Sequence, residues 1–456
     1  MEGCCRSILA YIKTTLGEPM DWKFKKLGPA IALTMVGLGS TGFAADKTPD
    51  RSRERERAEH ERNARGNERL PGYGNMDACA PEPAAPCYSL DTPPCDYCLG
   101  PENVAGNPAV RPYTCGGDVV IEVAGFYWNA HQDGLEFAIS NRVAAPANTG
   151  ADASPLNNLI EAEYLNPKAK WELGFKLGLG YDSTHDGWDL MLLWTHYRGR
   201  AGKEADIDLA DNSSLLPLWS AFSTTAGAAP GNNILYATDI DAHWKLRLDL
   251  VDLELGREFW SSKYLTLRPH IGLRYALIKQ SYDITHQGGA WSAVGATPAS
   301  NNLVDLDSKF KGVGVRGGLN STWMIGRGFA FFGNAAISIV YGRFSLDTDE
   351  TNSLAQNPFT STTIQDTEEH FRSAKGMTDL AFGLSWSTMF SECQYGFTLA
   401  LAWEHHMFFN QNHFWRVNRL GGAPVAQPNN SGANVFNKQS GDLSTQGWTL
   451  SATFQF

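Results

Sequence analysis

The chain has 456 residues, of which 43% are hydrophobic, 11% aromatic and only 19% charged, and its formal net charge is −11 at pH 7. This composition excludes a wholly disordered chain, and the acidic balance argues against a nucleic-acid-binding protein. After residue 45 the sequence has no run of about 18 uncharged apolar residues, which argues against an α-helical membrane protein. The composition does not exclude a transmembrane β-barrel, because the apolar surface of such a barrel is carried by alternating residues of its strands.

The N-terminal segment predicts export. From Met20 onward, three lysines precede an apolar stretch that ends in small residues before Asp46, which is the pattern of a secretory signal peptide. We expect residues 1–45 to form this Sec-type signal region, with cleavage near Ala44 or Ala45 and with Met20 as the true start. An amphipathic or membrane-anchoring helix is the alternative.

The following segment, residues 46–116, has no pattern of a packed core. An Arg/Glu run at 51–69 fits an exposed spacer or a solvated helix, and the rest is rich in Pro, Gly and Cys. We expect a periplasmic or plug segment with structural disulfides, leaving one thiol for a long-range or intermolecular bond. A redox or zinc pair is the alternative for the Cys-Asp-Tyr-Cys motif. The disulfide candidates are Cys79, Cys87, Cys95, Cys98, Cys115 and Cys393.

Residues 117–456 repeat one theme, which predicts an all-β, antiparallel transmembrane β-barrel of about 12 strands. Apolar residues alternate with polar or small ones from Trp171 to Tyr181 and from Trp188 to Trp194, and the short turn between them predicts a hairpin. The same pattern predicts further strands at 244–255, 265–277, 313–319, 329–341, 380–386, 395–403 and 448–456.

One of these strands departs from strict alternation. Its apolar residues occupy even positions from Trp244 to Leu250 and then odd positions at Leu253 and Leu255. Such a change of phase predicts a β-bulge.

Aromatic residues and connection lengths favour a membrane barrel over a soluble sandwich or soluble barrel. Trp and Tyr recur at both ends of the apolar segments, as in the girdles at the two lipid boundaries. Short links, including one after Trp128, alternate with long ones at about 143–166, 199–240, 284–308, 347–374 and 410–443. With the last strand ending in the periplasm at Phe456, the first of eleven traceable strands would run inward. A twelfth strand is then required before Gly117.

The polar phase of the strands predicts a lumen of mixed charge. Such a lumen favours small polar solutes, or its charges simply solvate it or pair with one another. A barrel of about twelve strands is narrow, so the N-terminal segment or an infolded loop could plug it. The long loops are acidic, which fits cation or divalent-ion binding at the mouth, or simple solubility. The expected pore-lining residues are Glu122, Lys176, Asp189, Lys245, Arg247, Asp249, Glu254, Arg268, Arg274, Arg316 and Glu404.

Three stretches carry a family resemblance: HDGWDLMLLWTHY at 185–197, LDLELGREFWSSKYLTLRPHIGLRYA within 250–276, and GVGVRGGLNSTWMIGRGFAFFGNAAISIVYGRF at 312–344. They resemble the Legionella-type major outer membrane protein family, which is similar in role to chlamydial major outer membrane proteins. The resemblance covers roughly 117–456 and implies an outer-membrane pore, often in a cysteine cross-linked envelope. The Arg/Glu run and the Cys-rich insert depart from the family's pattern.

We therefore expect a bacterial outer-membrane porin that passes ions and small polar solutes, surrounded by outer-membrane lipid, without cofactor, bound metal or nucleic acid. A homo-oligomer or disulfide-linked envelope proteins are the expected partners. The alternative is a structural or adhesive envelope protein, disulfide cross-linked, without significant transport. Enzymatic motifs such as G-x-S-x-G and H-E-x-x-H do not occur, and only Glu404 and His406 share a strand face, with His405 on the other.

Overall fold

The computed structural model describes part of the chain. The described residues are 109–110, 117–145, 156, 158–208, 212–222, 235–292, 299–354, 360–391, 394–420 and 433–456. The expected signal region, the six disulfide candidates and all of the 46–116 segment except Ala109 and Val110 lie outside them. Within these ranges no helix is both long and apolar enough to cross a membrane.

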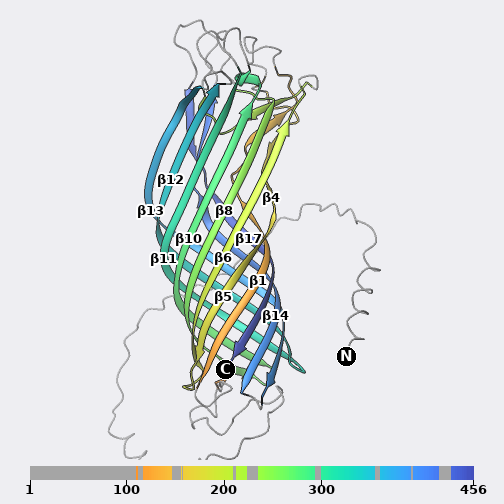
Figure 1. Cartoon of the computed structure of the whole chain (residues 1–456), viewed down its shortest axis with the longest axis vertical. Coiled ribbons are helices and arrows are strands. Elements are labelled where there is room, and N and C mark those ends of the chain that lie inside the picture. The colour runs from red at the N-terminus through yellow and green to blue at the C-terminus, as the bar shows by residue number, and fades with distance from the viewer. Residues whose placement is uncertain are drawn as a thin grey trace, which may run out of the picture. The chain divides into compact units, whose positions relative to one another are not determined.

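Ten long antiparallel strands close into a ring (Figure 1). Each pairs with the next in the chain, and the last pairs with the first. Two short strands, β4 (Lys168–Ala169) and β9 (Phe259–Ser262), pair with ring strands and bring the sheet to twelve. The ring strands are β1 (Asp118–Gln132), β5 (Trp171–Asp182), β6 (Trp188–Asp206), β8 (Asp239–Arg257), β10 (Leu265–Gln287), β11 (Ser300–Gly326), β12 (Phe329–Leu354), β13 (Thr360–Phe390), β14 (Tyr395–Asn412) and β17 (Gly441–Gln455).

The closure between β1 and β17 corrects the expected start of the barrel. The Val119 amide donates to the Phe456 carbonyl over 2.7 Å, and the Phe456 amide donates back over 3.1 Å. Because β17 ends at the short-turn end of the ring, its antiparallel neighbour β1 runs away from that end, not toward it. No turn follows Trp128, since β1 continues to Gln132. The ring thus closes without a strand before Gly117.

The remaining elements belong to the long connections at the other end of the ring, which is the upper end in Figure 1. One group is a three-stranded sheet and another is a hairpin of two strands. These elements are β2 (Ala138–Asn141), β3 (Glu163–Leu165), β7 (Ser214–Pro217), the 3₁₀ turn η4 (Gly289–Trp291), β15 (Trp415–Leu420) and β16 (Ala433–Lys438).

The strand β8 alternates without interruption, so the expected bulge is absent. Its pairing with β6 and β10 has no register shift from Asp239 to Arg257. In the upper part the inward side chains are apolar, and Trp244 and Leu248 are at most 1% exposed. In the lower part the outward side chains are apolar, and Leu253 and Leu255 are 40% and 44% exposed. The apolar face of β8 is therefore the inward one in the upper part and the outward one in the lower part. Throughout the strand, even-numbered side chains point inward and odd-numbered ones point outward.

The same exchange of faces occurs on the neighbouring strands and explains why their upper parts were expected to be loops. The strands β10 to β13 continue well into 284–308 and 347–374, where most outward side chains are polar. The inward ones include apolar residues such as Ile284, Leu306 and Phe371 beside buried polar ones such as Asn302 and Glu350. Without an apolar outward face, these parts lack the pattern of a lipid-facing strand.

The exposed apolar side chains of the lower part form a continuous band, which we name the apolar belt. It includes Leu179 and Leu192 on β5 and β6, Ile271 on β10 and Ile339 on β12. An exposed apolar surface that surrounds a barrel is stable only in lipid. Aromatic side chains border it, and those of four ring strands contact one another at 5.2–6.3 Å between ring centres: Tyr127, Trp171, Trp403 and Trp448.

The exchange of faces on β8 predicts a large loss of stability for one substitution on this strand and a small loss for another. Leu248→Ala should lower the free energy of unfolding by about 2–5 kcal/mol, because Leu248 is fully buried. Lys245→Ala should cost less than about 1 kcal/mol, because this side chain is exposed and makes one surface ion pair. Urea unfolding of the refolded barrel measures both values, and equal costs would contradict the assignment of faces.

Candidate lumen site

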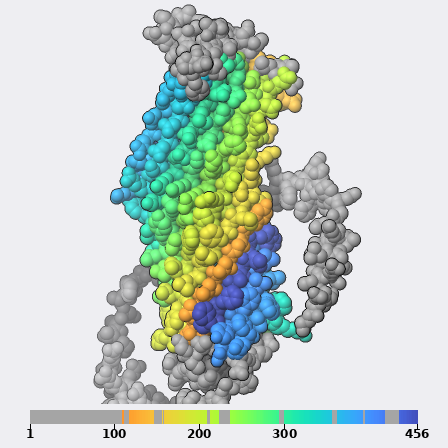
Figure 2. All heavy atoms as spheres, in the orientation of Figure 1, coloured from red at the N-terminus to blue at the C-terminus, as the bar shows by residue number. Residues whose placement is uncertain are grey.

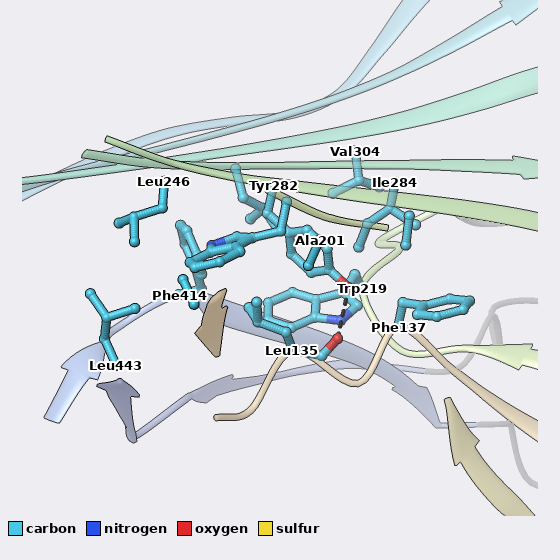
Figure 3. Packing of buried hydrophobic residues seen from close by; sticks show 14 of the residues in the cluster. Leu135, Phe137, Ala201, Trp219, Leu246, Tyr282, Ile284, Val304, Phe414 and Leu443 are labelled. Carbon is cyan, nitrogen blue, oxygen red and sulfur yellow. Dashed lines mark hydrogen bonds between the residues drawn. The ribbon is translucent and has the colours of Figure 1, made fainter. Parts of the chain in front are cut away.

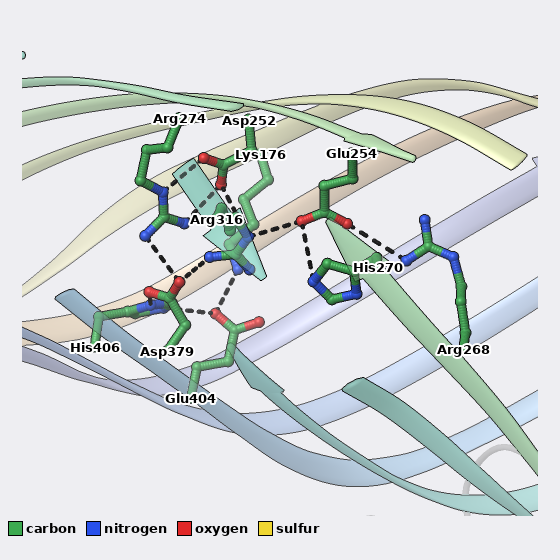
Figure 4. A network of polar contacts seen from close by, with 10 residues as sticks. All are labelled: Lys176, Asp252, Glu254, Arg268, His270, Arg274, Arg316, Asp379, Glu404 and His406. Carbon is green, nitrogen blue, oxygen red and sulfur yellow. Dashed lines mark hydrogen bonds and ion pairs between the residues drawn. The ribbon is translucent and has the colours of Figure 1, made fainter. Parts of the chain in front are cut away.

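The lower lumen holds a network of ion pairs that crosses the barrel (Figure 4). Arg274 on β10 donates to both carboxylate oxygens of Asp252 on β8, over 2.6 and 2.7 Å. Its third nitrogen lies 2.8 Å from Asp379 on β13. Arg316 on β11 pairs with the same Asp379 and, over 2.8 Å, with Glu254. One carboxylate therefore serves two guanidinium groups from different strands.

Two further groups extend the network on either side. Lys176 on β5 donates to Glu404 on β14 over 2.6 Å, and His406 lies 2.7 Å from Asp379 and 3.4 Å from Glu404. Toward the short-turn end, Arg268 donates to Asp189 over 2.8 Å and contacts Glu254 at 3.4 Å; His270 lies 3.7 Å from Glu254.

These side chains meet in the lumen because they share the inward phase of their strands. Each lies on the face opposite the apolar belt. Removing a charge from water is costly unless a close partner of opposite charge replaces the water. In this network each cation has a carboxylate within ion-pair distance, so the loss of one partner would leave a buried charge uncompensated.

A cavity of about 340 Å³ lies beside the network and extends to Asp182 and Gln455 near the short-turn end. Its lining contains seven carboxylates and three cationic side chains, so negative charge is in excess. The carboxylates are Glu122, Asp182, Asp189, Glu254, Glu258, Asp379 and Glu404, and the cations are Lys176, Arg268 and Arg316.

The upper lumen is filled by apolar side chains (Figure 3). Large aromatic residues from the ring strands point inward and are less than 2% exposed, among them Trp128, Tyr197, Trp244, Phe310 and Phe344. They pack in one cluster with residues of the long connections, such as Leu135, Phe137, Trp219 and Phe414. Within the described residues, the lumen is therefore polar below and closed by a packed core above.

Specific hydrogen bonds hold the infolded connections in this core. The Glu350 carboxylate on β12 accepts from the Ser220 hydroxyl and from the Ala221 amide, both over 2.6 Å. The Trp219 indole donates to the Glu136 carbonyl over 2.7 Å, and the Tyr282 hydroxyl donates to the Leu135 carbonyl over 2.7 Å. The segment 212–222 is thus attached to the barrel wall by a buried carboxylate.

The expected pore-lining residues divide into two groups. Lys176, Asp189, Glu254, Arg268, Arg274, Arg316 and Glu404 lie in the network, and Glu122 lines the cavity. Lys245 and Arg247 lie on the exterior, above the apolar belt, because the strand has no bulge there. Asp249 also faces outward but is buried beneath His196 and Arg247, with which it pairs.

Sequence reasoning missed Asp252 and Asp379. Asp252 was passed over because the assumed phase slip obscured its inward position on β8, and Asp379 because it precedes the apolar part of β13. Its position one residue before Leu380, in the polar phase, was the signal that could have identified it. The structure also confirms that Glu404 and His406 share the inward face, while His405 lies on the opposite one.

A closed antiparallel ring with an apolar belt outside and polar side chains inside defines an outer-membrane β-barrel. Residues 119–456 match the family described as "Legionella pneumophila major outer membrane protein precursor". The chain belongs to this family, as its sequence resemblance predicted, and the protein is located in the outer membrane. No curated protein matches the chain.

Several solved outer-membrane structures are distantly similar. The outer membrane protease OmpT from Escherichia coli has 9% identity and a TM-score of 0.26, with 75% of this chain and 98% of that chain covered. A FadL homologue from Pseudomonas aeruginosa has 9% identity and a TM-score of 0.23, with 77% and 92% covered. The toluene transporter TodX from Pseudomonas putida has 10% identity and a TM-score of 0.24, with 77% and 92% covered.

Removal of the shared carboxylate should destabilise the barrel strongly. Asp379→Asn removes the carboxylate that Arg274, Arg316 and His406 share. Arg274 then keeps Asp252 and Arg316 keeps Glu254, but the buried cations exceed the carboxylates near them by one more charge, so we expect a loss of about 3–5 kcal/mol in the free energy of unfolding. The matched control is Asp366→Asn on the exterior of β13, which should change it by less than about 1 kcal/mol. Similar effects of both variants in urea unfolding would refute the structural role of the network.

The upper core also makes stability dependent on pH. Burial, with the nearby cations Lys375 and Lys438, lowers the pKa of His413 from 6.5 to about 4. Between pH 4 and 6.5, His413 therefore binds a proton in the unfolded chain but not in the folded one. Its contribution to the free energy of unfolding is fully present above pH 6.5 and is lost as the pH falls toward 4. His413→Gln, whose amide oxygen can still accept from Lys375, should reduce this loss. The free energy of unfolding is measured by urea titration at several pH values. If its slope against pH is the same in the variant as in the parent, this assignment is wrong.

Proposed function

We propose that this chain is a structural protein of the outer membrane whose barrel is closed to solutes. The observation that supports it is the packed apolar core in the upper lumen. A solute path would expose several fully buried aromatic side chains, each at a cost of roughly 1.5–3 kcal/mol. For six such side chains the sum is on the order of 10 kcal/mol, and each 1.4 kcal/mol is a tenfold change in population. An open state of this kind would be too rare to carry flux.

The size of the ring and the pairing of its charges support the same proposal. An eight-stranded barrel is filled by its own side chains, whereas a sixteen-stranded one leaves an aqueous channel, and the ten-stranded ring is closer to the former. The cations of the lower-lumen network are held in ion pairs across the barrel, Lys176 with Glu404, and Arg274 and Arg316 with Asp379.

The structural role would extend to neighbouring molecules. Several cysteines in an exported chain are suited to disulfide bonds with other copies or other envelope proteins. We propose no catalytic role: the Glu404 and His406 pair, which shares a face, is engaged by Lys176 and Asp379.

A pore is the second candidate, and the charged cavity in the lower lumen favours it. If the upper core opens in the membrane, ions would pass the seven carboxylates and three cations of the cavity lining. The excess of negative charge would then favour cations over anions.

Single-channel recording distinguishes the two candidates. The mature protein, from about residue 46, is refolded, inserted in planar bilayers and recorded in asymmetric salt before and after reduction. We expect no stepwise current, because the apolar core closes the lumen. Stepwise currents with a cation-selective reversal potential would overturn the structural proposal and support the pore.

A matched variant shows that silence is due to the core and not to failed insertion. Deletion of 212–222 removes Trp219 and two partners of Glu350, Ser220 and Ala221, from the upper lumen, and Trp128→Ala with Trp244→Ala removes two ring-strand side chains of the same core. The combined variant should conduct where the intact chain does not. Membranes analysed without reductant supply the second readout. Cross-linked species that disappear on reduction are expected, and a purely monomeric chain would contradict the cross-linking part of the proposal.

A further inference from the structure

Unpaired cations gather on the exterior of the barrel, just above the apolar belt. We name five of them the cationic patch: Lys279 on β10, Lys309 and Lys311 on β11, Arg343 on β12 and Arg372 on β13. All are in the outward phase, and none has an ion pair with any described residue. These strands lie side by side across the upper face of the barrel in Figure 2.

The members of the cationic patch are direct neighbours. Lys279 is opposite Lys309, Lys311 is opposite Arg343, and Arg343 is opposite Arg372. Residues opposite each other in antiparallel strands have Cβ atoms about 5 Å apart, and like charges in this arrangement destabilise the sheet. Because no side chain of the described residues neutralises them, the arrangement is suited to an external group with more than one negative charge.

Acidic side chains limit the patch on its upper side. Two to six positions farther along the same strands, outward carboxylates oppose one another across neighbouring strands, from β10 to β13. An anion would be repelled there, so its position is restricted to the strip of cations. These carboxylates are Asp283, Asp305, Asp307, Asp347, Asp349, Asp366 and Glu368.

Apolar side chains border the patch on its lower side. The next outward residue from Lys311 toward the belt is Val313, and the next from Arg343 is Tyr341. Both side chains are more than half exposed. The opposite residue on β10 is Tyr275. A ligand that meets both surfaces must therefore have hydrocarbon chains directly joined to a multiply charged anionic group.

We propose that the cationic patch binds a phosphorylated glycolipid of the outer leaflet, of the lipid A type. Its phosphates contact Lys309, Lys311 and Arg343, and its acyl chains lie on the apolar belt beside Val313 and Tyr341. The patch lies toward the end of the barrel with the long connections, which is the external end in such proteins. The proposal holds whether the lumen conducts or not.

Native mass spectrometry of the intact protein in detergent tests the proposal. The probes are bisphosphorylated lipid A, the same lipid without phosphates, and inorganic phosphate. We expect lipid A to bind at least tenfold more tightly than its dephosphorylated form, and this difference to shrink at high salt, because charges on an exposed surface are screened.

Substitutions locate the site. The triple variant Lys309→Gln, Lys311→Gln, Arg343→Gln should bind lipid A at least tenfold more weakly. A control with three exposed lysines away from the patch changed, Lys168→Gln, Lys170→Gln and Lys263→Gln, should bind as the parent does. The single variants Lys311→Gln and Arg343→Gln, each exposed, replace the triple one if it fails to fold.

Three outcomes would overturn the proposal. Equal binding by the triple variant and its control would place the lipid elsewhere. Equal binding of both lipid forms would mean that only the acyl chains adhere to the belt. Displacement of lipid A by inorganic phosphate at matched concentration would mean that the patch is a site for a free anion.

Discussion

The period of two along each strand is the constraint on which the rest of the structure depends. In a closed ring every strand has one face toward the lumen and one toward the surroundings, and the pairing of β8 maintains this assignment over its full length. Where lipid surrounds the ring, the outward face must be apolar and the polar residues turn inward. Above the belt, water surrounds the ring, so the polar residues turn outward and the apolar residues fill the lumen.

This exchange of faces generates three regions with different roles. The lower lumen collects charges that must pair with one another, and Asp379 is central because it serves Arg274, Arg316 and His406. The upper lumen becomes a packed core that includes residues of the long connections. The upper exterior becomes a charged surface on which the cationic patch lies beside the apolar belt. Closure of the lumen is thus a consequence of the same alternation that places the barrel in lipid.

The lower part of the barrel could be predicted from the sequence because lipid imposes a simple pattern on it. Apolar alternation predicts the hairpin of β5 and β6, the lower parts of β13 and β14, and the terminal strand. The upper parts could not, since strands with a polar outside and an apolar inside resemble loops or a change of phase. That misreading put Lys245 and Arg247 in the lumen and left Asp252 out. The partners of Asp379 depend on contacts across the ring, which no local pattern contains.

Accessibility along β8 tests the exchange of faces most directly. Nitroxide labels are placed one at a time from Trp244 to Leu255 in a chain whose native cysteines are replaced by serine, and their collisions with oxygen and with a water-soluble nickel complex are measured. We predict that labels at Lys245 and Arg247 collide with the nickel complex, those at Leu253 and Leu255 with oxygen, and those at Leu246 and Leu248 with neither. Oxygen collisions at Leu246 and Leu248 would instead show a bulge and an apolar outer face, and would contradict the closed upper lumen.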